Sequence, residues 1–292
     1  MLKPVSMITA GILVLVAMVF LVHLSTDYND YSRYNPGWNG TSEFFKEIEG
    51  SDTVMLMDPQ ELLNQYNDST LLIIAPTGPY SLTEASIYKD YLSRGNTILL
   101  FDDFGNGNEL LDLMGVDIRI RTHPLVSADS AFNSPAFVMA FPGNTSPLTR
   151  NISSLVLDLP SSLKGGEPIL RTSLFSWEDT NGNHRADSNE TLGVFVVGSR
   201  QPVGKGQVIV ISDPGIFINA MSGDNNPGRA AFIKNILAPD TTIIIDQTHS
   251  LTANTTIPSR IIHIIQTTIF IHIGLLALIF ILFAFGFRKQ IW

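Results

Sequence analysis

The longest apolar stretches of this chain lie at its two ends. One covers residues 5–24 and the other 261–287, and neither contains Asp, Glu, Lys or Arg. A bilayer core about 30 Å thick requires roughly 20 apolar residues in a helix. The pattern therefore predicts a transmembrane helix in each stretch, with the whole middle of the chain suspended between them.

In the middle, short apolar runs alternate with amphipathic segments. Unbroken apolar runs, typical of buried strands, fall at 53–57, 71–75, 97–101, 208–211 and 242–246. Helices are predicted between them, at 42–48, 59–66, 82–94, 108–114 and 227–237. Strands without alternation, separated by helices, indicate a parallel sheet covered on both faces. The expected fold class is α/β, a doubly wound and mostly parallel sheet.

The helical signal fades from about 117 to 207, where Pro, Gly and Ser separate short strand-like runs. These runs are predicted at 116–120, 137–141, 155–159, 168–172, 193–198 and 207–211. We expect a β-rich insertion or edge here. The resulting organisation is a tip (1–4), a helix (5–24), an aromatic lead-in (25–40), an α/β domain (41–250), a linker (251–260), a helix (261–287) and a tail (288–292).

Charges beside the apolar ends predict an orientation. Lys3 precedes the first stretch, and Arg288 and Lys289 follow the second. Because Lys and Arg near membrane spans are retained on the cytoplasmic side, we expect a cell-membrane protein with cytoplasmic termini and an extracytoplasmic domain. A cleaved signal peptide is the alternative for the first stretch, although no A-x-A site follows it. A lipid-anchor signal is the alternative for the second.

Composition narrows the function of the middle segment. All 27 acidic residues lie there, and the chain has a net charge of −9, so binding to nucleic acid is not expected. The absence of cysteine excludes disulfides, thiolate zinc sites and a Cys nucleophile. Six N-x-[ST] triplets are glycosylation candidates on a translocated domain. They begin at Asn39, Asn67, Asn144, Asn151, Asn189 and Asn254.

Polar motifs follow three of the predicted strands, at 101–109, 212–219 and 246–249. Open α/β sheets bind ligands at the carboxyl ends of their strands, and amide groups at a following helix start can receive an anion. The alternative is that these residues are caps and turn-formers. The ligand-binding candidates are Asp102, Asp103, Asn106, Asn108, Asp213, Asn219, Asp246 and His249.

The sequence also resembles a known family. The segments on which the resemblance rests are NPGWNG, LLIIAP, SRGNTILLFDDFGNGNELL, ISDPGIFIN with a following DNN, and a late D-Q-x-H. They resemble the membrane-anchored proteins with domain of unknown function 4350, archaeal members above all. The resemblance implies a Rossmann-like fold of the class I glutamine amidotransferase type and an assembly with MoxR-type ATPases and von Willebrand A-like proteins. The late motif of the family is D-E-x-H, and Gln247 replaces its Glu. Because the chain has no Cys nucleophile, the resemblance does not imply amidotransferase activity.

A further motif, at 179–190, has the spacing of a calcium loop. Oxygen-bearing side chains occupy positions 1, 3, 5, 9 and 12, and the position-7 carbonyl would be the remaining ligand. His184 stands at position 6, where Gly normally makes the turn. The alternative is an Asx-rich hairpin without metal. The calcium candidates are Asp179, Asn181, Asn183, Arg185 (carbonyl), Asp187 and Glu190.

Two hypotheses for function follow. The first is a non-catalytic domain that binds a ligand or partner, as the absence of Cys and of a close Ser/His/Asp constellation suggests. The second is a hydrolase or glycan-active enzyme in which Asp102, Asp103, Asp213 and His249 supply acid and base. Convergence of Asp103, Asp213 and His249 within hydrogen-bonding distance would favour the enzyme.

Overall fold

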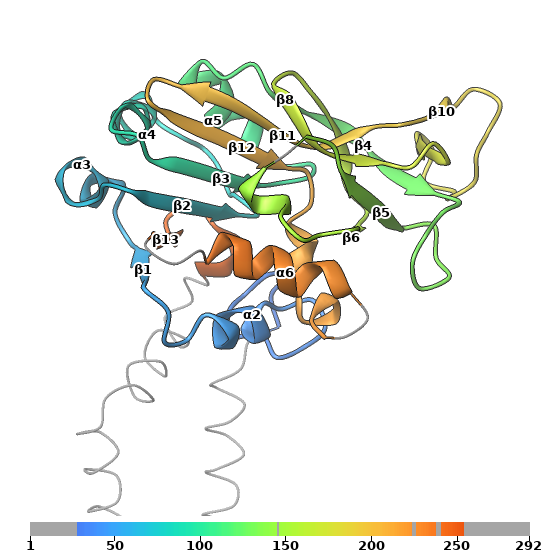
Figure 1. Cartoon of the computed structure of the whole chain (residues 1–292), viewed down its shortest axis with the longest axis horizontal. Coiled ribbons are helices and arrows are strands. Elements are labelled where there is room, and N and C mark those ends of the chain that lie inside the picture. Colours follow the sequence, from blue (N-terminus) through green and yellow to red (C-terminus); the bar gives the residue numbers. More distant parts are fainter. Residues whose placement is uncertain (1–27, 145, 224–225, 238–240, 254–292) are drawn as a thin grey trace, which may run out of the picture.

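The computed structural model describes residues 28–253 apart from 145, 224–225 and 238–240 (Figure 1). Nine strands form one mixed sheet: β1 (Thr53–Leu56), β2 (Ser69–Ile74), β3 (Thr97–Phe101), β5 (Phe137–Pro142), β6 (Leu155–Asp158), β8 (Glu167–Thr172), β11 (Val196–Val203), β12 (Gly206–Ile211) and β13 (Thr242–Asp246). Their order is β1-β13-β2-β3-β12-β11-β8-β5-β6. The strand runs predicted at 97–101 and 242–246 coincide with β3 and β13.

The first five strands of this order are mutually parallel. Their side chains are buried on both faces of the sheet, which is why the sequence shows unbroken apolar runs. Leu71 and Ile73 enter one core cluster, while Leu72 and Ile74 enter the other. Successive side chains of a strand point to opposite faces, so the sheet separates two cores.

Five α-helices are described: α2 (Ser42–Glu47), α3 (Leu62–Gln65), α4 (Leu82–Ser93), α5 (Gly107–Met114) and α6 (Pro227–Ile236). Figure 1 shows α4 and α5 on one face of the sheet and α2 and α6 on the other. α4 begins at a capping box, in which Ser81 and Glu84 bond each other's backbone N–H groups. Short 3₁₀ turns are η1 (Pro59–Glu61), η2 (Pro147–Thr149), η3 (Pro214–Phe217), η4 (Asn219–Met221) and η5 (Leu251–Ala253).

A second sheet has four strands: β4 (Arg119–Ser127), β7 (Ser161–Lys164), β9 (Ser176–Glu178) and β10 (Leu192–Gly193). Their order is β10-β9-β4-β7 and every pairing is antiparallel. β10 is therefore an edge strand. In Figure 1 it lies on a hairpin that projects away from the helices.

The expected fold class is wrong. A doubly wound sheet needs a helix in each crossover, but β5, β6, β8 and β11 join the main sheet antiparallel without one. β11 and β12, for example, are joined through Gly204 and Lys205, with Val203 paired to Gly206. Such a short hairpin requires antiparallel strands. The β-rich region thus extends the main sheet and builds a second one, giving a sheet-rich mixed fold with few helices.

The predicted membrane localisation also needs correction. In the described parts of residues 28–253, no helix is both long and apolar enough to cross a membrane. The stretches predicted to span, 5–24 and 261–287, lie outside the described residues.

The described part of the lead-in, from Tyr28 onward, packs on the domain. Asn219 of η4 accepts a hydrogen bond from the Glu43 amide at 2.8 Å and donates to the carbonyls of Asn35 and Gly37 at 3.0 and 2.7 Å. Tyr31 packs against the core on the α6 side. The lead-in therefore belongs to the same packed unit as the sheet.

Candidate functional site

The carboxyl ends of β3, β12 and β13 lie at one edge of the main sheet, as their parallel registers require. One acidic residue at the end of each of these three strands is buried. Asp102 is 3% exposed, while Asp213 and Asp246 are fully buried. A buried carboxylate must be hydrogen-bonded to be tolerated, so its partners decide what it can do.

Asp102 is bonded to the turn that starts α5. Its two carboxylate oxygens accept hydrogen bonds from the amides of Gly105 at 3.1 Å and Gly107 at 2.8 Å. A Cβ on Gly107 would lie 2.6 Å from that carboxylate, so only glycine allows this approach. Burial raises the pKa of Asp102, and these two amides partly offset the rise. Two of the amides that the sequence offers to an anion, those of Gly105 and Gly107, are therefore already bonded to Asp102.

A second acidic cluster contains Asp213, Asp103 and Asp158. Asp213 accepts hydrogen bonds from the amides of Gly215 at 2.5 Å and Asp158 at 2.7 Å, and so caps η3. Burial raises the pKa of Asp213 well above its ordinary value, and the Asp158 and Asp103 carboxylates add to the rise. Burial, followed by the charges of Asp102 and Asp158, raises the pKa of Asp103 to about 6.

The third motif, after β13, has its own partners. Asp246 accepts hydrogen bonds from the amides of Thr248 at 3.0 Å and His249 at 3.1 Å, which closes the turn. His249 Nε2 lies 2.8 Å from Glu84 Oε1, and its Nδ1 lies 3.1 Å from the Thr77 carbonyl. The Tyr80 ring packs on the imidazole with centroids 4.4 Å apart.

The contact with His249 affects the pKa of its carboxylate partner, Glu84. Although burial alone would raise it, hydrogen bonds from His249 and Ser81 hold the pKa of Glu84 below its ordinary value. Because the Thr77 carbonyl and the Glu84 carboxylate both accept, satisfying both requires a proton on each ring nitrogen. The pair joins the turn after β13 to the start of α4.

Three asparagines among the candidates also have structural partners. Asn108 donates to the Ile120 carbonyl and accepts from the Ile120 amide, both at 2.8 Å, which fixes α5 to β4. Asn106 donates to the Pro76 carbonyl at 3.4 Å. Asn219 holds the lead-in as described above. Ligand binding by these residues stays a prediction, but each side chain is already bonded to the protein.

These contacts separate the residues of the enzyme hypothesis. Among the described residues, no hydrogen bond or ion pair joins Asp103, Asp213 and His249. Asp102 and Asp213 cap turns, and His249 pairs with Glu84. The convergence that would favour a hydrolase is therefore not found in this part of the chain.

The loop 179–190 connects β9 to β10, and three of its backbone amides turn toward its first residue. Asp179 is 1% exposed and accepts hydrogen bonds from the amides of Gly182 at 2.8 Å, Asn183 at 3.2 Å and His184 at 2.9 Å. Gly182 and His184 have positive φ angles of 73° and 55°. His184 thus adopts the left-handed conformation for which Gly is usual at position 6, at some energetic cost.

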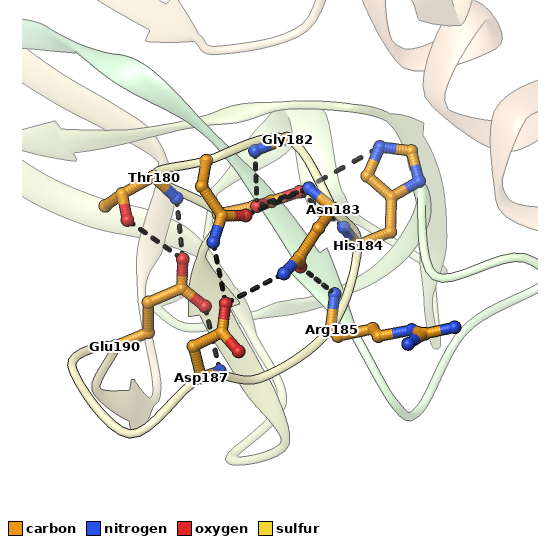
Figure 2. A network of polar contacts seen from close by, with 9 residues as sticks. Thr180, Gly182, Asn183, His184, Arg185, Asp187 and Glu190 are labelled. Atoms are coloured by element: carbon orange, nitrogen blue, oxygen red, sulfur yellow. Dashed lines mark hydrogen bonds and ion pairs between the residues drawn. The ribbon is translucent and has the colours of Figure 1, made fainter.

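Side chains at positions 3, 5 and 9 of the loop meet at one point. The side-chain nitrogens (Nδ2) of Asn181 and Asn183 donate to Oδ2 of Asp187 at 2.7 and 2.8 Å (Figure 2). Glu190, at position 12, accepts from the Thr180 amide at 2.8 Å and from the Asp187 amide at 3.2 Å. The loop is therefore closed by its own hydrogen bonds, as in the metal-free alternative.

Calcium would need a different orientation of two of these groups. Both asparagines present nitrogen to Asp187, whereas calcium takes oxygen ligands, so each amide would have to turn over. Within the described ranges, no group of three or more His, Cys, Asp or Glu side chains is placed to hold a metal ion. The candidate ligands thus share one small region without forming a completed cage.

Large apolar side chains are exposed on both sides of this loop. Leu174 and Phe175, before β9, are 64% and 58% exposed, and Leu192 and Val194, at β10, are 55% and 47% exposed. They are four of the eleven exposed large apolar residues in the described chain. All four residues flank or belong to one pair of strands, β9 and β10, and exposed apolar residues gathered in this way are a candidate contact surface. We call these four residues the hairpin patch.

Most of the predicted glycosylation sites are accessible. Asn67, Asn144, Asn151 and Asn189 are exposed. Asn39 is half-buried and donates to the Asp30 carboxylate. Asn254 lies outside the described residues. Glycosylation itself stays a prediction.

Sequence reasoning missed the partners of His249. The position of Glu84 at a helix start can be predicted, because Ser81 and Glu84 have the spacing of a capping box. Nothing in the sequence places that helix start beside a turn 165 residues away. It also missed the hairpin patch, because exposure of Leu192 and Val194 depends on which strands lie beside β10.

Comparison with known proteins finds distant structural similarities and one matching family. No curated protein matches. Among solved structures, the chain is similar to the mmIFT52 N-terminal domain, with 14% identity, a TM-score of 0.46 and coverage of 63% of this chain and 82% of that one. It is also similar to beta-galactosidase from Bacillus circulans sp. alkalophilus, with 11% identity, a TM-score of 0.33 and coverage of 57% and 22%.

A cytoplasmic protein, STM1381, from Salmonella typhimurium LT2 is similar with 11% identity, a TM-score of 0.29 and coverage of 63% and 71%. Likenesses this distant carry no argument about function. The family model described as a domain of unknown function, DUF4350, matches residues 33–237, which is most of the chain. The protein therefore belongs to the DUF4350 family.

Proposed function

We propose that this protein is a non-catalytic binding domain that holds a partner protein at the hairpin patch. The observation that carries the proposal is the concentration of exposed Leu174, Phe175, Leu192 and Val194 on one hairpin at the end of the second sheet. Their burial would stabilise a complex, at about 25 cal/mol per Å² of apolar surface removed from water.

The form of the partner follows from the strand beside the patch. β10 is an edge strand, so its outer backbone groups are open to an added strand. The segment 174–194 contains four acidic residues and one basic residue. A matching partner is an extended segment in which apolar residues alternate with basic ones. A second copy of this acidic chain is disfavoured by its charge.

The contacts at the carboxyl edge support a non-catalytic role. Asp102 and Asp213 cap turns and His249 is paired with Glu84, so each of these side chains already has a structural partner. An assembly with MoxR-type ATPases and von Willebrand A-like proteins, implied by the sequence resemblance, stays a prediction.

Calcium in the 179–190 loop is a second and separable proposal. It rests on oxygen-bearing side chains at positions 1, 3, 5, 9 and 12 and on the positive φ angles of Gly182 and His184. An ion there would stiffen the connection between β9 and β10, and with it the hairpin patch. The patch does not require the ion for its exposure.

Peptide binding tests the main proposal. The full-length protein is titrated with ten-residue peptides that alternate apolar residues with Lys, and with matched peptides that carry Glu in place of Lys. We expect saturable binding of the Lys peptides alone. The double variant Phe175→Ser/Leu192→Ser should lose it, while Leu82→Ser, which changes a residue 77% exposed elsewhere, should retain it. Equal binding of both peptide sets, or equal loss in Leu82→Ser, would contradict the proposal.

A further inference from the structure

A row of polar side chains lies at the amino ends of three neighbouring strands. The parallel registers pair Thr70 with Thr97 and Thr97 with Gln207. Two positions further along the same strands, Leu72, Leu99 and Ile209 belong to the core on the α6 side. Because side chains two apart share a face of the sheet, the polar row lies on this same face. The apolar core therefore ends there in hydroxyl and amide groups.

A cavity of about 170 Å³ lies over this row. The sheet lines it with the polar row and with Leu99, Ile209 and Arg200, and Arg200 is paired with Ile209 in the register of β11 and β12. η2 and α6 close the other side. Their contributions include Ser146, just before η2, together with Leu148, Asn235 and Ile236.

Several polar groups in this cavity have unused bonding capacity. Ser146 is 4% exposed, and its hydroxyl has no hydrogen-bond partner among the residues that the structure describes. Arg200 donates from Nε to Glu167 at 2.8 Å. Its two terminal nitrogens make no hydrogen bond to any described residue. A ligand that bonds the Ser146 hydroxyl, after rotation of this side chain toward the cavity, would satisfy a buried group that otherwise destabilises the fold.

The chemistry of these groups selects an anion. The guanidinium presents five N–H donors in a planar fork, and its two terminal nitrogens match the two oxygens of a carboxylate. Glu167 accepts from Nε and so fixes the orientation of the guanidinium. The two terminal nitrogens, which bond no described residue, can then bond a ligand. Leu99, Ile209 and Ile236 offer an apolar wall beside it.

We propose that this cavity binds a small aliphatic carboxylate. The carboxylate bonds the terminal nitrogens of Arg200 and the hydroxyl of Ser146, and the hydrocarbon part packs on Leu99 and Ile209. Drug-sized ligands occupy pockets of about 300–1,000 Å³. The smaller volume here limits the ligand to a few carbon atoms. The site lies at the amino ends of the strands and is independent of the hairpin patch.

Calorimetric titration of the full-length protein tests the proposal with isovalerate, butyrate and the neutral analogue isovaleramide. We expect saturable binding of isovalerate with a Kd of about 1 mM or below, which corresponds to roughly −4 kcal/mol. Isovaleramide, which has the same shape without the charge, should bind at least tenfold more weakly. Arg200→Gln should weaken isovalerate binding at least tenfold, and Ser146→Ala should weaken it severalfold.

Arg121→Gln is the matched control, because Arg121 Nε also faces a glutamate, 3.8 Å away, but on the second sheet. It should bind isovalerate like the unaltered protein. Thr70→Leu fills the cavity without removing a charge and should abolish binding, which keeps the test informative if Arg200→Gln does not fold. No saturable binding up to about 10 mM, binding of isovaleramide equal to isovalerate, or equal loss in Arg121→Gln would overturn the proposal.

Discussion

Replacing Asp103 by Asn should stabilise the protein at neutral pH and leave its stability unchanged in acid. Burial and the charges of Asp102 and Asp158 raise the pKa of Asp103 from 3.8 to about 6. The folded state therefore holds this proton more tightly than the unfolded state. Stability from the protonated form is fully present below pH 3.8 and is lost as the pH rises through about 6.

The size of the effect follows from the shift. One pKa unit corresponds to 1.36 kcal/mol, so a shift of about two units makes the ionised carboxylate cost about 3 kcal/mol at most. Asp103 is half-buried, and solvent screening lowers that figure. Asn retains the oxygen that accepts from the Phe104 amide at 2.7 Å. We therefore expect Asp103→Asn to gain about 1.5–3 kcal/mol at pH 8.

Urea denaturation of both proteins at pH 8 and at pH 3.5 measures this difference. Asp90→Asn, an exposed position on α4, is the control and should change stability by less than about 0.5 kcal/mol at either pH. A gain of the same size at both pH values would refute the burial argument. A loss of stability at pH 8 would show that the carboxylate makes a favourable contact there.

Three further predictions concern other parts of the molecule. Glu84→Gln keeps the capping box but removes the charge facing His249, and should cost about 1–2 kcal/mol at pH 7 in urea denaturation; the difference should shrink as the pH falls through the lowered pKa of Glu84. Asn219→Ala removes the bonds to the lead-in and should cost about 2–3 kcal/mol, with faster hydrogen exchange at the Glu43 amide. Millimolar calcium should raise the melting temperature of the full-length protein but not of Glu190→Gln; an unchanged Tm in the unaltered protein would count against the calcium loop.

Secondary structure in the parallel half of the sheet is readable from the sequence. Buried strands such as Thr97–Phe101 must be apolar on both faces, and that requirement leaves an unbroken run. Helix ends carry local chemistry as well, such as Ser81 with Glu84 at the start of α4 and Gly115 in a left-handed conformation after α5. These signals arise within a few residues of the feature that they predict.

The fold class was missed because it depends on long-range pairing. Strands β7 and β9 have three or four residues each, with small polar residues such as Ser161 and Ser176 buried among neighbours. No local pattern distinguishes such strands from loops. Whether β8, β5 and β6 extend the main sheet or form another depends on the pairing of β8 with β11, which the sequence does not encode locally.

The candidate site was predicted in position but not in contacts. Parallel strand ends must share an edge, so Asp102, Asp213 and Asp246 were expected together. Their partners are mostly backbone amides of their own turns. This is the role of caps and turn-formers, which Asp and Asn commonly take and which was the alternative to ligand binding. The polar row of Thr70, Thr97 and Gln207 gave no signal, because it exists only in the register between strands.

The most direct test of the binding role is site-specific photo-crosslinking in cells that produce the protein. A photoreactive amino acid replaces Leu192 in the hairpin patch or, as a control, Leu82, which is more exposed to solvent and distant along the chain. We predict a discrete crosslinked protein from position 192 that is absent from position 82 and is lost when Phe175→Ser is added. No adduct at position 192, or the same adduct from both positions, would contradict a partner-binding hairpin.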